Sequence, residues 1–382
     1  MSDIIQNHKH IVFGFEHYNP LGIVRSLGEN GIDPIGIIIK SNRPITSKSK
    51  YLKETYFVDG IEAGYDLLNE KFGNEVNKPF VYASDDQVTN YMDARFDEIK
   101  DKFYFYNAGK PNRIAEFQNK DNILQLAIEK GLNVLKTYAV SKGEIPEGLE
   151  YPIITKAIIS TIDAWKDDMI ICHNEDELKQ AYKKIRSERV LLQKYIIKKN
   201  ELCMEGCSAS KGTKALISIA SQYNYQLEDS YSPYMTVQNL NDSNLEKKLK
   251  DMLSEIGFEG IFEIEFLVDQ EDELYFLEIN LRNSTWSYAS TVAGMPLPII
   301  WACGMLNGST IEDSYRKIER PFTAMVEFDD YRRRVKTNVI SKRKWINDLK
   351  NSECKYYIGK RDIKPFLSVI FNKFKRSAHK ED

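Results

Sequence analysis

The sequence predicts a parallel α/β unit at the N-terminus, followed by α+β architecture. Over about residues 8–105, buried-strand runs alternate with helix-like segments, which is typical of a parallel sheet. From about residue 150 onward, strands and helices mix with hairpins, which favours antiparallel sheets. Residues 261–281, IFEIEFLVDQEDELYFLEINL, read as two strands joined by a polar turn at 270–273.

The N-terminal unit has three predicted strands, HIVFGF (10–15), DPIGIII (33–39) and PFVYAS (79–84). In open α/β sheets, ligands bind beyond the carboxyl ends of the strands. Phe15–Asn19 and Ser84–Asp86 are therefore expected beside a substrate crevice. Ordinary polar loop residues explain these segments equally well.

The second part alternates helices and strands. Gly131 stops a helix that starts near Asn119, and Lys156 lies inside an apolar strand. A helix over 240–256 carries apolar residues at 245, 249, 252, 253 and 256. The other expected elements are strands at 132–140, 151–159, 190–197, 201–209 and 215–220, and a helix at 175–185.

Composition indicates an ordinary globular protein, with 42% hydrophobic and 29% charged residues among 382. No apolar run reaches the roughly 20 residues of a membrane helix, and MSDIIQNHKH lacks a signal-peptide pattern. A cytoplasmic location is expected. The five cysteines have no zinc-type spacing and are expected to be reduced thiols.

Charge is unevenly distributed. Residues 331–382 hold 16 Lys or Arg and 5 Asp or Glu, a balance of +11 within a chain of net charge −3. Such a tail suits an anionic substrate, a membrane surface or nucleic acid, although a solvated helical face is the commoner explanation. No nucleic-acid motif is present, so nucleic acid is not expected as a partner. The segment PFLSVIFNKFKR (365–376) suggests a basic amphipathic helix that weakly contacts a membrane.

The hairpin at 261–281 suggests a metal site. Folding it about its centre sets Glu265 opposite Glu278 and Glu263 opposite Asn280, with Arg282 on the same face. Directly opposed like charges destabilise a strand pair, and oxygen ligands suit Mg²⁺. A solvated acidic face is the alternative. The other face is expected to carry Phe262, Ile264, Phe266 and Val268 against Tyr275, Leu277, Ile279 and Leu281.

Three upstream features could bind a nucleotide. Lys120 begins a helix, and a buried Lys156 needs an anion, which a phosphate or a structural salt bridge would supply. A strand ends in Gln193-Lys194-Tyr195-Ile196, where a crossing chain could bind a base edge. Glu201 follows within reach of ribose hydroxyls.

Together these residues resemble the ATP-grasp superfamily over roughly residues 8–310, and most strongly over 115–290. The resemblance implies an N-terminal pre-ATP-grasp domain (1–110), two lobes that clamp ATP (111–310, divided into about 135–200 and 200–310) and a basic extension (311–382). It also implies roles for the matching residues: phosphate-binding lysines Lys120 and Lys156, adenine linker Gln193, Lys194, Tyr195 and Ile196, ribose-binding Glu201, and Mg²⁺ ligands Glu265, Glu278 and Asn280. Mn²⁺ could substitute for Mg²⁺. Arg282 in E-I-N-L-R matches the arginine that holds phosphate or an acyl phosphate, so Arg282 and Lys156 are the expected catalytic groups.

Two departures from the superfamily pattern stand out. The segment IISTIDAWKDDMI (158–170) has no glycine where a glycine-rich phosphate loop is usual. Ser160, Thr161 and Lys166 are expected to contact phosphate instead. Gln193 replaces a common glutamate, and its carbonyl could still accept from an adenine amino group.

The resemblance implies an ATP-dependent ligase that joins a carboxylate to an amine through an acyl phosphate. A carboxylase, a phosphotransferase and a degenerate nucleotide-binding module remain open. Asn19-Pro20-Leu21-Gly22, SKSKYLKE (47–54), Ala83–Asp86 and the tail motifs around Trp345 and Asp362–Phe366 look like a branch with D-aspartate ligases and cell-envelope polysaccharide proteins. His17, Asn19, Arg25 and Arg332–Arg334 are candidate acceptor contacts. Relatives are often dimers, so a homodimer is possible.

Overall fold

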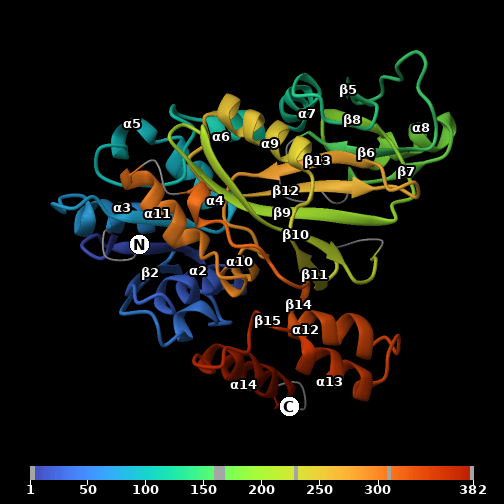
Figure 1. Cartoon of the computed structure of the whole chain (residues 1–382). Coiled ribbons are helices and arrows are strands. Elements are labelled where there is room, and N and C mark those ends of the chain that lie inside the picture. Colours follow the sequence, from blue (N-terminus) through green and yellow to red (C-terminus); the bar gives the residue numbers. More distant parts are fainter. Residues whose placement is uncertain (1–4, 159–167, 228–230, 308–310, 379–382) are drawn as a thin grey trace.

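The computed structural model describes residues 5–158, 168–227, 231–307 and 311–378. Ser160, Thr161 and Lys166 lie outside the described residues. The predicted fold class is confirmed: a parallel α/β domain precedes two lobes that are built mainly on antiparallel sheets (Figure 1).

The N-terminal domain contains a four-stranded parallel sheet in the order β3-β2-β1-β4. Three strands match the predicted ones: β1 (His10–Phe15), β2 (Pro34–Ile39) and β4 (Phe80–Ala83). The sequence prediction missed β3 (Glu54–Val58), because this edge strand is mostly exposed or half-buried and gives no apolar run. The accompanying helices are α2 (Tyr18–Gly28), η1 (Thr46–Lys48), α3 (Ile61–Phe72), α4 (Asp86–Asp93) and α5 (Phe96–Ile99).

A small lobe holds the second sheet, ordered β5-β8-β6-β7, with every pairing antiparallel. Two helices lead into it, α6 (Arg113–Gln118) and α7 (Lys120–Glu129), and the Asn119 side chain caps α7. The lobe packs a hydrophobic core separate from that of the rest of the protein. Its elements are β5 (Thr137–Ser141), β6 (Ile153–Ala157), β7 (Ile171–Cys172), α8 (Glu175–Lys184) and β8 (Arg189–Lys194).

The large lobe is a seven-stranded sheet in the order β13-β12-β9-β10-β11-β14-β15. Its strands are β9 (Asn200–Ala209), β10 (Lys214–Tyr223), β11 (Tyr234–Gln238), β12 (Gly260–Val268), β13 (Leu274–Asn280), β14 (Phe322–Met325) and β15 (Cys354–Lys355). Across the sheet runs α9 (Ser243–Ile256), which is capped by Asp242 and ended by Gly257 at φ +77°. Its buried residues are the five predicted ones. The sheet therefore extends past residue 310, because β14 and β15 belong to the tail sequence.

The remaining helices connect the large lobe to the other parts of the chain. They are α10 (Tyr288–Val292), α11 (Leu297–Asn307), η3 (Glu312–Ser314), α12 (Glu327–Asp330), the π-helix η4 (Tyr331–Val335), α13 (Lys342–Asn351) and α14 (Lys364–Ala378). Among the described residues, no helix combines the length and apolar character needed to cross a bilayer. All five cysteines are buried, and none forms a disulfide.

A β-bulge changes one part of the predicted hairpin. Glu265 faces Glu278 and Glu263 faces Asn280, as predicted, but the register then shifts so that Phe266 faces Phe276. The core face therefore carries Phe276, which packs edge-on against Phe266 at 5.6 Å. The prediction that Tyr275 and Leu277 lie on this face is wrong, because alternation fails where a strand gains a residue.

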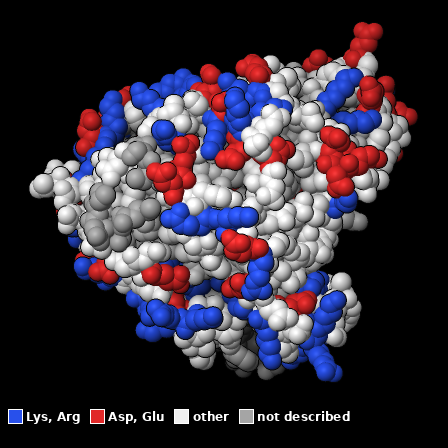
Figure 2. Space-filling view, in the orientation of Figure 1, with Lys and Arg blue, Asp and Glu red and all other residues white. Residues whose placement is uncertain are grey.

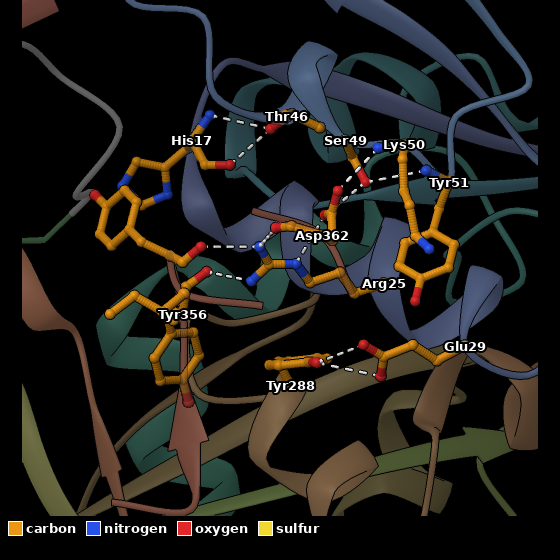
Figure 3. A network of polar contacts seen from close by, with 12 residues as sticks. His17, Arg25, Glu29, Thr46, Ser49, Lys50, Tyr51, Tyr288, Tyr356 and Asp362 are labelled. Carbon is orange, nitrogen blue, oxygen red and sulfur yellow. Dashed lines mark hydrogen bonds and ion pairs between the residues drawn. The ribbon is translucent and has the colours of Figure 1, made fainter. Parts of the chain in front are cut away.

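The C-terminal segment is fastened to the N-terminal domain through Arg25 (Figure 3). This fully buried guanidinium bonds to the Asp362 carboxylate at 3.0 Å and donates to the carbonyl groups of Tyr356, Tyr357 and Asp362. Asp362 also accepts from the Ser49 hydroxyl and the Lys50 N–H. The structure therefore does not present Arg25 as an acceptor contact, because these protein atoms take its hydrogen bonds.

A buried carboxyl group in the N-terminal domain predicts a pH effect on stability. Asp93 is fully buried; one oxygen accepts from the Ile114 N–H at 3.0 Å, and the other has no hydrogen bond among the described residues. Burial raises the pKa of Asp93 to about 7. A raised carboxyl pKa gives stability at low pH that is lost as the pH rises from about 4 to about 7. We expect Asp93→Asn to remove this loss, because an amide oxygen still accepts from Ile114.

Thermal unfolding at a series of pH values measures this effect. Between pH 5 and pH 8, the free energy of unfolding of Asp93→Asn should rise relative to that of the wild type by on the order of 2 kcal/mol. Asp101→Asn, at an exposed position nearby, is the control and should show no such gain. Parallel pH profiles for wild type and Asp93→Asn would contradict the prediction.

Candidate functional site

A cleft lies between the sheet of the small lobe and the β12–β13 hairpin. It contains a cavity of about 690 Å³ lined by residues of both lobes. Leu267 and Leu277 from the hairpin face Leu135, Ile154 and other apolar residues. The bulge thus turns Leu277 toward the cavity rather than the core. Six predicted nucleotide residues line the same cavity: Lys156, Gln193, Lys194, Tyr195, Ile196 and Glu201.

Four other predicted residues line a smaller pocket of about 150 Å³. Lys120, Glu278, Asn280 and Arg282 line it together with Asp86. The Lys120 ammonium group is 3.7 Å from a Glu278 oxygen. Because Lys120 and Glu278 both influence the charge state of Lys156, the two pockets are electrostatically connected.

Lys156 is a buried cation without an acidic hydrogen-bond partner among the described residues. Its Nζ donates to the Gln193 side-chain oxygen at 2.7 Å. Burial, followed by the positive charge of Lys120, lowers the pKa of Lys156 to about 8. A phosphate group beside Lys156 would favour the charged form, so the position suits an anionic ligand.

Gln193 does not present its carbonyl as the sequence prediction expected. That oxygen accepts from Lys156, while the side-chain amide donates to the Thr137 hydroxyl at 3.0 Å. Gln193 is also only 3% exposed. The residue therefore orients Lys156, and a base edge would meet the following linker. There, the Ile196 N–H makes no hydrogen bond within the described residues.

Glu201 lies at the linker end of the cavity, at the start of β9. It is 8% exposed and accepts a hydrogen bond from Lys198. This contact uses one of the two carboxylate oxygens.

The acidic cluster on the hairpin contains more carboxylates than the predicted ligand set. The Asn280 amide donates to Glu263 and Glu265, at 3.0 Å each, and its oxygen accepts from Arg282. Burial raises the pKa values of Glu263 and Glu265 well above the usual range, and the negative charge of neighbouring carboxylates raises them further. Mutual repulsion of this kind is relieved by a cation.

Sequence reasoning missed Glu205, a fully buried carboxyl group next to this cluster. Hydroxyl groups of Ser284 and Ser287 each donate to it at 2.6 Å. Burial raises the pKa of Glu205 to about 7. The available signal was one acidic residue inside the apolar strand LCMEGCSA, because such a residue requires polar partners.

The donor set fits a hard divalent cation in chemistry. Glu265 and Glu278 carry carboxylate oxygens on two paired strands, which is the ligand type that Mg²⁺ prefers. The Asn280 oxygen accepts from Arg282, so it would have to turn toward the metal to act as a third ligand. No group of three or more His, Cys, Asp or Glu side chains in the described part of the chain is arranged as a metal site. The predicted ligand set consists of two carboxylates and one amide.

Arg282 connects the hairpin to the N-terminal domain. Its Nε bonds to Asp86 at 2.9 Å, at the start of α4. Arg282 and Asp86 also border a third pocket, of about 340 Å³. Residues of the two crevice segments predicted from the sequence line it, namely Phe15, Glu16, His17, Asn19, Ser84, Asp85 and Asp86, together with Pro20 and Thr285. The structure thus brings the carboxyl ends of β1 and β4 to Arg282.

Three of the other candidate acceptor contacts support the fold: Asn19, His17 and Arg334. Asn19 is buried and its amide donates to the carbonyls of Ser84 and Asn283. His17 borders the third pocket, and its ring caps α2 by accepting from the Asn19 N–H. Arg334 is buried against Asp330 and Asp348. The exposed Arg332 pairs with Asp329 at 2.9 Å.

Solved structures share this architecture. An L-amino acid ligase from Bacillus licheniformis has a TM-score of 0.65 and 13% identity, over 84% of this chain and 80% of that one. N5-carboxyaminoimidazole synthetase from Staphylococcus aureus has a TM-score of 0.65 and 14% identity, over 85% of this chain and 83% of that one. A third structure is the biotin carboxylase domain of 2-oxoglutarate carboxylase from Hydrogenobacter thermophilus, in complex with MgADP, ADP and bicarbonate. It has a TM-score of 0.63 and 16% identity, over 83% of this chain and 74% of that one. At these identities the likeness shows the fold alone.

Sequence comparison gives the family. No curated protein matches the chain by sequence. Residues 115–312 match the family described as carbamoyl-phosphate synthase L chain, ATP binding domain. This match includes both lysines, the linker and the hairpin, and it spans more than half of the 382 residues. The chain therefore belongs to this family of ATP-binding domains, within the ATP-grasp superfamily.

Proposed function

We propose that this protein is an ATP- and Mg²⁺-dependent ligase that joins a carboxylate to an amine through an acyl phosphate. The observation that carries the proposal is that three cations, Lys120, Lys156 and Arg282, line two electrostatically connected pockets, one of which also contains the hairpin carboxylate Glu278. Phosphoryl transfer depends mainly on positioning and charge neutralisation rather than on a protein nucleophile.

The nucleotide would occupy the 690 Å³ cavity. Leu267 and Leu277 offer apolar surface to a base, and the linker backbone at Ile196 offers its N–H to the base edge. Lys156 and Lys120 would then neutralise phosphate oxygens. Glu265, Glu278 and Asn280 would hold Mg²⁺, which when bound supplies further neutralisation of the phosphates.

The carboxylate substrate would bind in the third pocket, beside Arg282. Its oxygen would attack the γ-phosphorus, and breaking the bond between this phosphorus and the bridging oxygen releases ADP. The amine would then attack the acyl carbon to form the C–N bond. Phosphate leaves, and the amine loses a proton. Arg282 would stabilise charge on the transferred phosphoryl group.

A substrate panel tests the proposal. ADP release is measured with a set of carboxylates alone, with carboxylate and amine pairs, and with hydroxylamine as a trap. The ligase predicts release that requires an acid and an amine, and a hydroxamate in the trap. ADP release that depends on bicarbonate or on an alcohol alone would favour a carboxylase or a phosphotransferase. Binding of ATP without turnover in every pairing would favour a degenerate nucleotide-binding module.

The wider setting is also part of the proposal. We expect a role in cell-envelope or polysaccharide metabolism, as in the branch containing D-aspartate ligases, because of the tail motifs around Trp345 and Asp362. Five cysteines that form no disulfide, together with the proposed use of ATP, support a cytoplasmic location. Ultracentrifugation would test a homodimer. On α14, exposed Leu367 and Phe371 support weak contact with a membrane, which sedimentation with anionic and neutral vesicles would test.

A further inference from the structure

A second large cavity lies outside the ATP cleft, in the C-terminal part of the structure. It has a volume of about 590 Å³. Four chain segments that are distant in sequence form its walls: the loop before η1, the α12–η4 helical pair, the loop after β15, and α14. The lining residues are Arg43, Ile45, Phe328, Asp329, Tyr331, Arg332, Lys336, Tyr357, Val369 and Asn372.

The cavity wall combines aromatic rings with an excess of positive charge. Phe328 packs edge-on against Tyr357 at 4.9 Å, so one wall is a rigid aromatic surface. Three cations and one carboxylate line the cavity, and the carboxylate of Asp329 is paired with Arg332. Arg43 and Lys336 have no ion pair with any described residue. An anion with a ring-sized apolar body would satisfy both features.

The cationic wall is held in place by a rare helix type. Residues 331–335 form a π-helix, which in proteins is frequently found at functional sites. Arg334 anchors it from the inside, with two oxygens of Asp330 and one of Asp348 as partners. Arg332 and Lys336 are left on the side of the cavity. In Figure 2, several Lys and Arg side chains also appear at the lower end of the molecule, where Figure 1 shows the C-terminal helices.

Short contacts connect this cavity to the pocket beside Arg282. Ile45 lines the cavity, and its N–H donates to Glu16, which lines the other pocket, at 2.7 Å. The Thr46 hydroxyl donates to the carbonyl of His17 at 2.7 Å (Figure 3). One short loop therefore forms part of the wall between the two spaces. A molecule bound in the cavity would lie next to the proposed reaction centre.

We propose that this cavity binds the anionic, ring-bearing part of the amine substrate, with a phosphate or carboxylate held by Arg43, Arg332 and Lys336. This assignment rests on the proposed ligase function. It names the acceptor as an organic anion and gives the π-helix a recognition role. ATP and the acid are bound elsewhere, so occupancy of the cavity does not compete with the nucleotide.

Binding of 1-naphthyl phosphate, measured by calorimetry with saturating Mg²⁺ and ADP, tests the cavity without requiring turnover. We expect one site per chain. Arg43→Gln/Lys336→Gln should weaken binding at least about tenfold, since each lost charge-assisted hydrogen bond is worth about that factor. Lys342→Gln/Lys344→Gln removes the same charge from exposed positions on α13 and should change the dissociation constant by less than about twofold. Neutral 1-naphthol should bind at least about tenfold more weakly than the phosphate.

Three results would overturn the proposal: unchanged binding by Arg43→Gln/Lys336→Gln, binding of 1-naphthyl phosphate that is seen without ADP and lost when ADP is added, or equal binding of 1-naphthol. A fourth would be binding to phosphatidylglycerol vesicles that depends on Arg43 and Lys336, with no binding of the soluble phosphate, because the cavity would then serve a lipid surface. If the substrate panel fails while the phosphate still binds, the ligase reaction is wrong and the anion site remains.

Discussion

Glu278→Gln is expected to lower turnover by about 10²–10³-fold or more while the protein stays folded. Glu278 faces Glu265 across the hairpin and borders the pocket that also contains Lys120 and Arg282. An amide of the same shape removes one of two charged ligands for Mg²⁺. It also reduces repulsion with Glu265, so stability should not fall. ADP production over a range of Mg²⁺ concentrations measures the loss, and thermal unfolding checks the fold.

Glu271→Gln is the matched control, because Glu271 lies in the exposed turn of the same hairpin. It should retain normal turnover. If Glu278→Gln kept a near-normal rate at ordinary Mg²⁺ concentrations, the assignment of the metal ligands would be wrong. If instead both variants lost activity, the effect would come from the hairpin as a whole rather than from the metal.

The hairpin also shows how far sequence alone predicts a site. Strand alternation places Glu263 and Glu265 opposite Asn280 and Glu278, because a two-residue period is fixed by backbone geometry. The same rule fails at Leu277, because a β-bulge shifts the register there and the residue types of the strand do not indicate a bulge. The fold class was predictable because long apolar runs mark buried strands, whereas the exposed edge strand β3 gave no such run.

Side-chain partners were harder to predict than strand positions. Gln193 was correctly located near the end of a strand, yet its side-chain carbonyl accepts from Lys156 rather than being left for an adenine amino group. The partner comes from β6, 37 residues earlier, and sequence spacing does not report such pairings. Asp86 was expected near a crevice, but its ion pair with Arg282 joins residues 196 positions apart. Contacts of this length depend on how the domains pack.

Arg25 is the strongest example, because a candidate substrate contact is instead a buried structural cation. Its side chain and that of Asp362 are 0% and 1% exposed, and the two residues are 337 positions apart in the sequence. Replacing one partner of a buried ion pair leaves the other charge buried without compensation. We expect Arg25→Met to lower the free energy of unfolding by about 3–5 kcal/mol, measured by chemical denaturation.

A double variant distinguishes the effect of losing the ion pair from the effect of changing the side-chain packing. Arg25→Met/Asp362→Leu should be less destabilised than the sum of its single variants, because no unpaired charge remains. Arg320→Met breaks an ion pair with Glu353 in which Arg320 is 82% exposed, and should cost less than about 1 kcal/mol. Two results would show that the buried ion pair is not the source of the lost stability. One is a double variant whose loss equals the sum of the single losses, and the other is an equal loss of unfolding free energy in Arg25→Met and Arg320→Met.

The same variant connects stability to the anion cavity. Arg25 holds the carbonyl of Tyr357, whose ring forms part of the cavity wall, and Asp362 precedes α14, which forms another part. Arg25→Met should therefore loosen the C-terminal segment and weaken binding of 1-naphthyl phosphate. The ATP cleft is built from other elements, so the affinity for ADP should be unchanged. Equal losses of both ligands would mean that Arg25 supports the whole fold rather than the C-terminal segment.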